Sequence, residues 1–171
     1  MARISHTQVT ELHRLLAQWH KHINGFYRFD MAELAGELRN GVKTPVLMLE
    51  SYSSQIKTNP NKTTNFKDRD ISFLLLDFAG KADDYDKHDE VLSRMEEIGD
   101  DIASMLDRLN KDKSHWLFML FDAGTFRMEK VGPLMDGMYG WNILYTLSSR
   151  NPLCFEPDKW ELSSPVPEVG A

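Results

Sequence analysis

The chain has 171 residues, with 20 Lys and Arg against 26 Asp and Glu, which gives a formal net charge of −6. Its length suits one domain, and 42% hydrophobic with 27% charged residues is ordinary for a globular protein. The negative charge argues against a dedicated nucleic-acid-binding protein, because phosphate contacts need clustered Lys and Arg. The single cysteine, Cys154, excludes an intramolecular disulfide and a Cys-rich zinc site.

Neither a secretory signal nor a membrane span is indicated by the sequence. The first residues lack the apolar run of a signal peptide. The longest apolar stretches, 73–76 and 116–121, are far shorter than the ~20 residues that a membrane-spanning helix needs. We therefore expect a protein that folds in a reducing cytoplasm and has no membrane partner.

Two helices are expected before the first strand. Ser5 and Gln8 have the spacing of a capping box, and the apolar residues after them recur three or four apart. This pattern predicts a helix that ends at the Asn-Gly pair 24–25. A shorter helix over 30–39 is predicted by a second capping box, which begins at Asp30.

Two extended runs surround a polar connection in the next part of the chain. The run 46–56 is apolar at first and then mixed, and the second run is centred on 71–78. Between them, 59–65 is polar and rich in turn-forming residues. We expect a long hairpin whose tip lies in solvent.

The segment 92–109 has the clearest helical pattern in the chain. Its apolar residues form a sustained stripe, and the acidic residues within 83–90 precede it, where carboxylates favour the helix dipole. Gly99 interrupts the stripe, which costs about 1 kcal/mol against Ala and permits close packing on a sheet. The helix is expected to end at 111–113.

Three further strands are predicted after this helix. A buried strand is expected over 116–121 and a shorter one over 126–131, with a turn at 122–125 between them. In the last strand, 140–148, large apolar residues alternate with smaller or polar ones.

This order of elements predicts an α+β fold. We expect a mostly antiparallel sheet with one long crossover helix and the N-terminal helices packed on it. A single domain is predicted over 1–162, followed by a flexible C-terminal tail over 163–171.

The sequence carries no catalytic or phosphate-binding motif, so no catalytic residue, metal, cofactor or small-molecule substrate is expected. It has no G-x-S-x-G elbow and no Gly-rich phosphate loop. His20 and His22 are the candidates for a small metal-dependent enzyme that also uses nearby carboxylates, but they lack the i, i+4 spacing of a helical metal pair. A polar helix face is the simpler interpretation.

Two charged segments are candidate contact surfaces. The acidic residues within 83–90 lack the spacing of an EF-hand loop and are interpreted as a helix cap, or as an electrostatic rim for a basic partner. The hairpin residues 57–69 include Lys62 and Lys67 in a local positive patch, which could face DNA or an acidic neighbouring subunit. A solvated loop is the simpler interpretation of this patch.

Met and aromatic residues gather in the C-terminal third of the chain. Trp141, Phe155 and Trp160 belong to this group, and Gly and Pro flank it. Aromatic residues and Met are enriched at the centres of protein interfaces, so the group either completes the core or contacts another subunit.

The order of elements resembles that of the small tail-completion proteins of tailed bacteriophages, the tail-terminator or neck-type subunits. The resemblance covers roughly residues 5–160. It includes a last strand that opens with a Gly-aromatic step, at Gly140 and Trp141, and the ending 154–160. The second predicted helix, 30–39, departs from the family pattern, because a minimal terminator would not need it.

The resemblance implies a non-enzymatic structural subunit of the virion tail or neck, assembled in the cytoplasm of the bacterial host. Such subunits form a homo-oligomeric ring, commonly hexameric, that caps the tail tube and joins it to the head connector. The implied partners are other copies, tube and connector proteins, and DNA that passes through the lumen. On this reading the subunit-interface candidates are Lys62, Lys67, Trp141, Phe155 and Trp160.

One alternative from the residues themselves is an intracellular adaptor or immunity-type module. Such a module would bind a basic partner through the acidic face at 83–90.

Overall fold

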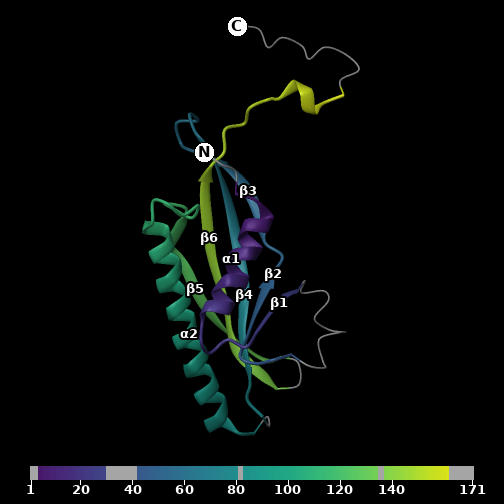
Figure 1. Cartoon of the computed structure of the whole chain (residues 1–171), viewed down its shortest axis with the longest axis vertical. Helices are drawn as coiled ribbons and strands as arrows, with labels where there is room; N and C mark the ends of the chain where they lie inside the picture. Colours follow the sequence, from purple (N-terminus) through teal and green to yellow (C-terminus); the bar gives the residue numbers. More distant parts are fainter. Residues whose placement is uncertain (1–3, 30–41, 81–82, 135–136, 162–171) are drawn as a thin grey trace.

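A computed structural model describes residues 4–29, 42–80, 83–134 and 137–161 of the chain. The helices and strands of these residues are drawn in Figure 1. In chain order the elements are α1 (His6–Trp19), β1 (Gly25–Phe29), β2 (Val46–Glu50), β3 (Ser53–Thr58), β4 (Asn65–Phe78), α2 (Tyr85–Lys111), β5 (Phe121–Leu134), β6 (Met138–Arg150) and the short 3-10 helix η1 (Pro157–Lys159).

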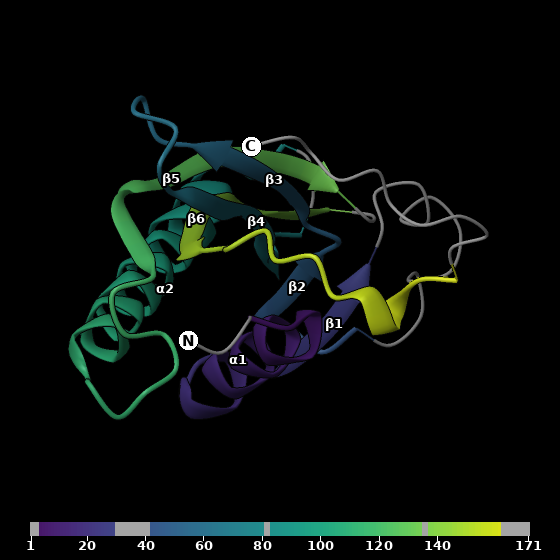
Figure 2. The same ribbon diagram turned by 90° about the horizontal axis from the view of Figure 1, so that it is seen from above.

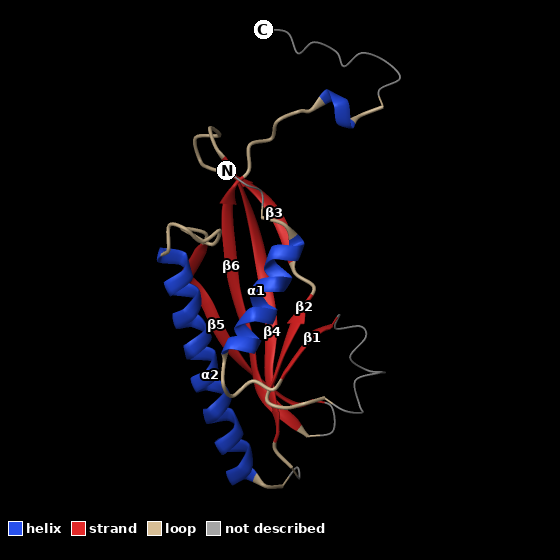
Figure 3. Ribbon diagram, viewed as in Figure 1, coloured by secondary structure: helices blue, strands red, loops and turns tan. Residues whose placement is uncertain are grey.

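The strands form one six-stranded sheet in the order β1-β2-β4-β6-β5, with β3 beside β4. β1 pairs with β2 in parallel, and every other pair is antiparallel. Both α-helices lie against the same face of this sheet (Figures 2 and 3). The predicted α+β fold with a mostly antiparallel sheet is confirmed.

The crossover helix is α2, which connects β4 to β5. Because β6 lies between these two strands and is antiparallel to both, β4 and β5 run in the same direction. The chain leaves the sheet at the end of β4, crosses one face of the sheet as α2 and re-enters it as β5, two strand positions away. The last strand, β6, then fills the position between β4 and β5. This is the arrangement that a single long helix between groups of strands predicts.

The longest pairing in the sheet joins β4 to β6, from Phe66 opposite Arg150 to Phe78 opposite Met138. Gly140 allows the two backbones to come together in this ladder. A Cβ added at Gly140 would lie 1.8 Å from the carbonyl oxygen of Leu75, a separation that no side chain can adopt.

The main hydrophobic core lies between the helices and the sheet. Alternate residues of the central strands point into it, among them Phe73 of β4 and Tyr145 of β6, and they meet Leu12 of α1 and Met95 of α2. A second buried cluster lies on the other face of the sheet and consists of Phe29, Val46, Met48, Leu74, Leu76 and Met138.

The rest of that second face is polar. Asp68 accepts a hydrogen bond from the Ser148 hydroxyl (2.7 Å), and Asp70 accepts one from Thr146 (2.9 Å). Antiparallel sheets commonly pack one face on the core and leave the other in contact with water, and here the second face does so outside its own small buried cluster.

The signals predicted at the starts of α1 and α2 are present in the structure. The hydroxyl of Ser5 accepts from the Gln8 backbone N–H, and the Gln8 side chain accepts from the Ser5 N–H, so the capping box of α1 is confirmed. Asp84 caps α2 by accepting from the Lys87 N–H. A Cβ added at Gly99 would lie 2.5 Å from the sulfur of Met128, which confirms the close approach of α2 to the sheet.

The prediction for the end of the first helix is wrong. α1 ends at Trp19, and the backbone N–H of His20 closes its last turn on the Leu16 carbonyl. Gly25, which we interpreted as part of a helix stop, instead begins the unpredicted strand β1 and pairs with Val46. Glycine is needed here because a Cβ would lie 2.7 Å from the Lys43 carbonyl oxygen.

The buried strand expected over 116–121 is also absent. The N–H groups of Phe118 and Leu120 donate to carbonyls three residues earlier, so this run is a series of turns that leads into β5 at Phe121. Leu117 is buried in the core while Met119 is exposed. A short apolar run that packs against the core as a series of turns has the same composition as a buried strand. The sequence pattern alone therefore could not distinguish the two, and a strand was wrongly predicted.

The remaining strands differ from the predictions in their limits. The predicted run 46–56 is divided into β2 and β3, and β4 begins before the run that we centred on 71–78. The turn expected at 122–125 is an irregularity within β5, where the register with β6 shifts. The helix expected over 30–39 and the tail expected over 163–171 lie outside the described residues.

We predict that Gly140→Ala lowers the free energy of unfolding by about 3 kcal/mol or prevents folding. The added methyl group would displace the Leu75 backbone, which cannot yield as a flexible side chain does. Urea unfolding followed by circular dichroism measures the change. Gly124→Ala is the control, because a Cβ there meets only the Asp122 carboxylate, at 3.3 Å, and a change of less than about 1 kcal/mol is expected. Equal losses in both variants would contradict the argument.

Candidate functional site

After β6 the chain continues as an extended segment, residues 151–161, which we call the C-terminal arm. It projects beyond the end of the sheet (Figure 1). The backbone N–H of Asn151 donates to the Asn65 carbonyl (2.9 Å) and so ties the base of the arm to β4. Among the described residues, no backbone N–H later in the arm donates to the sheet.

The arm carries large apolar side chains that are exposed. Leu153 is 64% exposed, Phe155 55% and Trp160 62%. The rings of Phe155 and Trp160 stack on each other with centroids 6.1 Å apart. Between them η1 forms one turn, which the ion pair between Lys159 and Glu156 spans. We call this pair of rings, on its single turn, the aromatic knob.

Most of the predicted interface residues lie at this end of the sheet. Lys67, Phe155 and Trp160 line one open pocket of about 490 Å³ at the base of the arm. Lys62 lies in the turn between β3 and β4, which is at the same end of the molecule (Figure 1). Its φ of 54° is in the left-handed region, and its backbone N–H donates to Asn59.

A buried arginine forms part of the floor of the same pocket. Arg69 donates to the Ile4 carbonyl (2.8 Å) and to the Ser149 hydroxyl (3.1 Å). No acidic residue lines the pocket among the described residues, so Lys67, Arg69 and Arg150 give it a positive charge. Lys67 and Arg69 belong to the positive patch expected around the hairpin, whereas Lys57 of the same hairpin forms an ion pair with Asp68 (2.8 Å).

Trp141 lies elsewhere. It is half-buried against α2, and its indole N–H donates to the Leu92 carbonyl (2.9 Å). The structure therefore separates Trp141 from the arm. In the sequence Trp141, Phe155 and Trp160 could not be told apart in this way, because all three are large aromatic residues of the same segment. That Trp141 contacts another subunit stays a prediction.

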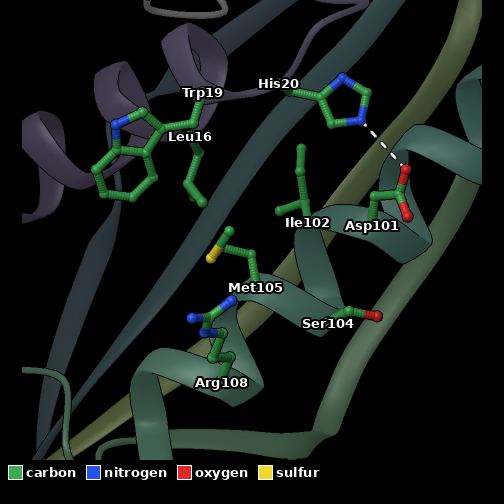
Figure 4. Close-up of a pocket in the computed structure, with 8 residues that line it drawn as sticks. All are labelled: Leu16, Trp19, His20, Asp101, Ile102, Ser104, Met105 and Arg108. Carbon is green, nitrogen blue, oxygen red and sulfur yellow. Dashed lines mark hydrogen bonds and ion pairs between the residues drawn. The ribbon is translucent and has the colours of Figure 1, made fainter. Parts of the chain in front are cut away.

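A second candidate site, which sequence reasoning missed, is the groove between α1 and α2 (Figure 4). It has a volume of about 320 Å³ and is lined by Leu16, Trp19, His20, Asp101, Ile102, Ser104, Met105 and Arg108. Leu16 and Ile102 are buried at its floor, whereas Trp19 is 51% exposed at its rim. We call it the interhelical groove.

The polar rim of the groove is organised around His20. The Nε2 atom of His20 lies 3.2 Å from the Asp101 carboxylate, and its Nδ1 accepts from the His22 backbone N–H (3.3 Å). These bonds place the ring proton of neutral His20 on Nε2, where it donates to Asp101. Both ring nitrogens are therefore engaged within the chain.

The described residues do not form the metal site for which His20 and His22 were the candidates. Their rings lie 5.8 Å apart, and no group of three or more His, Cys, Asp or Glu side chains in the described part of the chain could hold a metal ion.

No helix among the described residues combines the length and hydropathy that crossing a bilayer requires.

The acidic segment at the start of α2 includes the expected helix cap. Asp84 is the N-cap, and Glu90 forms an ion pair with Lys87 (2.8 Å). Asp83, Asp86 and Asp89 are exposed. They remain available to a basic partner, which is the second role that we considered for this segment.

One further histidine is buried beneath α1. His13 donates from Nδ1 to the Val9 carbonyl (2.7 Å), and its Nε2 accepts from the hydroxyl of Tyr145 (3.0 Å). Burial lowers the pKa of His13 to about 4, although its hydrogen bond to Val9 acts in the opposite direction. His13 is thus neutral and enclosed, and it joins α1 to β6 rather than serving a surface site.

No protein-family model, curated protein or solved structure matches this chain.

The pKa of His13 predicts an acid-sensitive fold. Between its ordinary value of 6.5 and about 4, the unfolded chain binds a proton at His13 that the folded chain does not, so the free energy of unfolding falls as the pH falls. The full effect is about 3 kcal/mol. Urea unfolding at pH 7, 6.5, 6, 5.5 and 5 follows a large part of this loss, above the range in which most carboxylates titrate.

Two variants test the assignment to His13. His13→Gln is expected to be less stable at pH 7 but to lose less stability on acidification, because its amide does not titrate. His22→Gln, at an exposed position, is expected to keep the pH dependence of the parent chain. An unchanged pH dependence in His13→Gln would contradict the assignment.

Proposed function

We propose that the chain is a non-enzymatic structural subunit that assembles with other copies into a ring. In this proposal the ring caps the tail tube of a phage or phage-like particle and joins the tube to the head connector. The observation that carries the self-assembly is the C-terminal arm, which holds Leu153, Phe155 and Trp160 out in solvent. The link to a tail comes from the resemblance in element order.

The energetic argument concerns the apolar surface of the arm. Burying one large apolar side chain contributes about 1.5–3 kcal/mol, and aromatic residues on exposed segments often anchor interfaces. The arm leaves its own sheet after Asn151, so a second molecule is the natural surface to cover it. If each copy gives its arm to the next, the contacts are head-to-tail, and a head-to-tail contact closes into a ring when its rotation permits.

The charges at the arm end fit the same proposal. Lys62 and the pocket residues Lys67, Arg69 and Arg150 lie at one end of an otherwise acidic protein. A positive end suits an acidic surface on a neighbouring subunit or on the tube. It also suits brief contact with DNA that passes through the lumen, because phosphate contacts need such clusters.

The alternative function is an adaptor or immunity-type module that binds one basic partner. Asp83, Asp86 and Asp89 are exposed near Tyr85 in the sequence, which is also exposed, and this favours such a partner at the start of α2. A one-to-one complex that weakens strongly with salt, formed by a chain that does not self-assemble, would favour this function.

We predict that the arm is required for assembly and not for folding. Light scattering of the full chain should show a species of several subunits, and negative-stain images of that species should show a ring with a central hole. A chain that ends at Asn151 should be monomeric, with an unfolding midpoint close to that of the full chain, because the arm contributes little to the core.

A chain that ends at Glu161 is the matched control, since it keeps the arm and lacks only the last ten residues of the sequence, 162–171. It should assemble like the full chain. Equal masses for the chains that end at Asn151 and at Glu161 would contradict a role for the arm.

A further inference from the structure

We propose that the C-terminal arm of one copy binds in the interhelical groove of a neighbouring copy, with the aromatic knob as the inserted part. The proposal rests on the self-assembly proposed above and adds the surface that receives the arm. Its partner is a second copy of this chain, identified by apolar fit and by charge.

The arm and the groove match in size and polarity. The groove has an apolar floor made by Leu16, Ile102 and Met105, and its volume of about 320 Å³ is at the small end of sites that enclose a ligand group. One aromatic side chain of the knob is an occupant of suitable size. An indole also needs an acceptor for its N–H, which the Asp101 carboxylate at the rim can provide.

Charge complementarity points to the same pairing. The arm carries exposed Asp158 and Glu161, while Glu156 is paired with Lys159. The rim of the groove carries Asp101, whose carboxylate is bonded to His20, and Arg108, which forms no ion pair with a described residue. The arm would therefore bind in the orientation that brings Asp158 or Glu161 close to Arg108 while an aromatic ring enters the groove.

The positions of the two surfaces favour binding between copies. In Figure 1 the arm extends beyond the end of the sheet, and the two α-helices lie alongside the sheet. The groove lies between these helices. In the view from above, η1 also lies away from the space between α1 and α2 (Figure 2). Each copy therefore presents one knob and one groove in different places, and this is the requirement for a head-to-tail contact.

Mixing two chains that each lack one half of the contact tests the proposal. The chain that ends at Asn151 keeps the groove and has no arm. Full-length Met105→Arg keeps the arm and places a charged side chain in the groove. Each chain alone should be monomeric by analytical ultracentrifugation, and an equimolar mixture should form a one-to-one complex, because only one intact contact is available.

Full-length single variants keep the test independent of any folding defect in Met105→Arg. Arg108→Glu, at an exposed position, and Trp160→Ala should each weaken self-association about thirtyfold or more, as expected for the loss of an interface anchor. Trp160→Phe should restore much of the affinity. Glu97→Arg, exposed on α2 and outside the groove, is the control and should change affinity less than twofold.

The outcomes separate this proposal from the proposed function. Rings that form equally well with Arg108→Glu or Met105→Arg would overturn the groove as the receiving surface and leave the ring function standing. Salt-sensitive pairs or open chains that need both the arm and the groove, without a closed ring, would support the groove and contradict the ring.

Two further results would overturn the inference. One is a full-length chain that is monomeric at every concentration. The other is a monomer whose tryptophan fluorescence is quenched more strongly after Met105→Arg, with no such increase when Trp160 is also replaced by Phe, because the arm would then occupy its own groove.

Discussion

The long antiparallel pairing of β4 with β6 is the constraint on which the other elements depend. It runs from Phe66 opposite Arg150 to Phe78 opposite Met138, and Gly140 lets the two backbones meet without a side chain between them. β2 and β3 share the outer edge of β4, and β5 pairs with β6. Because β6 lies between β4 and β5, the connection from β4 to β5 must cross the sheet, and α2 makes this crossing on the face that α1 also covers.

The same pairing makes the two ends of the sheet different from each other. β4 begins, and β6 ends, at one end of the sheet, so the hairpin with Lys62 and the C-terminal arm lie together there. The Asn151–Asn65 hydrogen bond is the point at which the chain separates from the sheet. The acidic start of α2 follows the opposite end of β4. The basic pocket and the exposed aromatic residues of the arm thus lie at one end of the sheet, and the acidic residues at the start of α2 lie at the other.

The interhelical groove depends on how α1 is held. His13 on α1 bonds to Tyr145 of β6, and α1 also packs on Leu47 and Leu49 of β2. The two helices do not need to touch along their length, since each is fixed to the sheet separately. A gap between them can then remain open at Leu16 and Met105 and receive a side chain from another molecule. A buried neutral histidine makes this support sensitive to acid, because burial disfavours its protonated form and lowers its pKa to about 4.

Local patterns in the sequence determined α1 and α2, the capping box of α1 and the long hairpin, because the periodicity of apolar residues and the capping residues act over three or four positions. The arm residues Phe155 and Trp160 were also identified as interface candidates from composition. Only the tertiary structure decided that Trp141, which is also a large aromatic residue of the C-terminal third, packs against α2. It also decided that Gly25 begins a parallel strand rather than ending a helix. The groove brings together residues 16–20 and 101–108, and no local pattern reports which faces of two distant helices will meet.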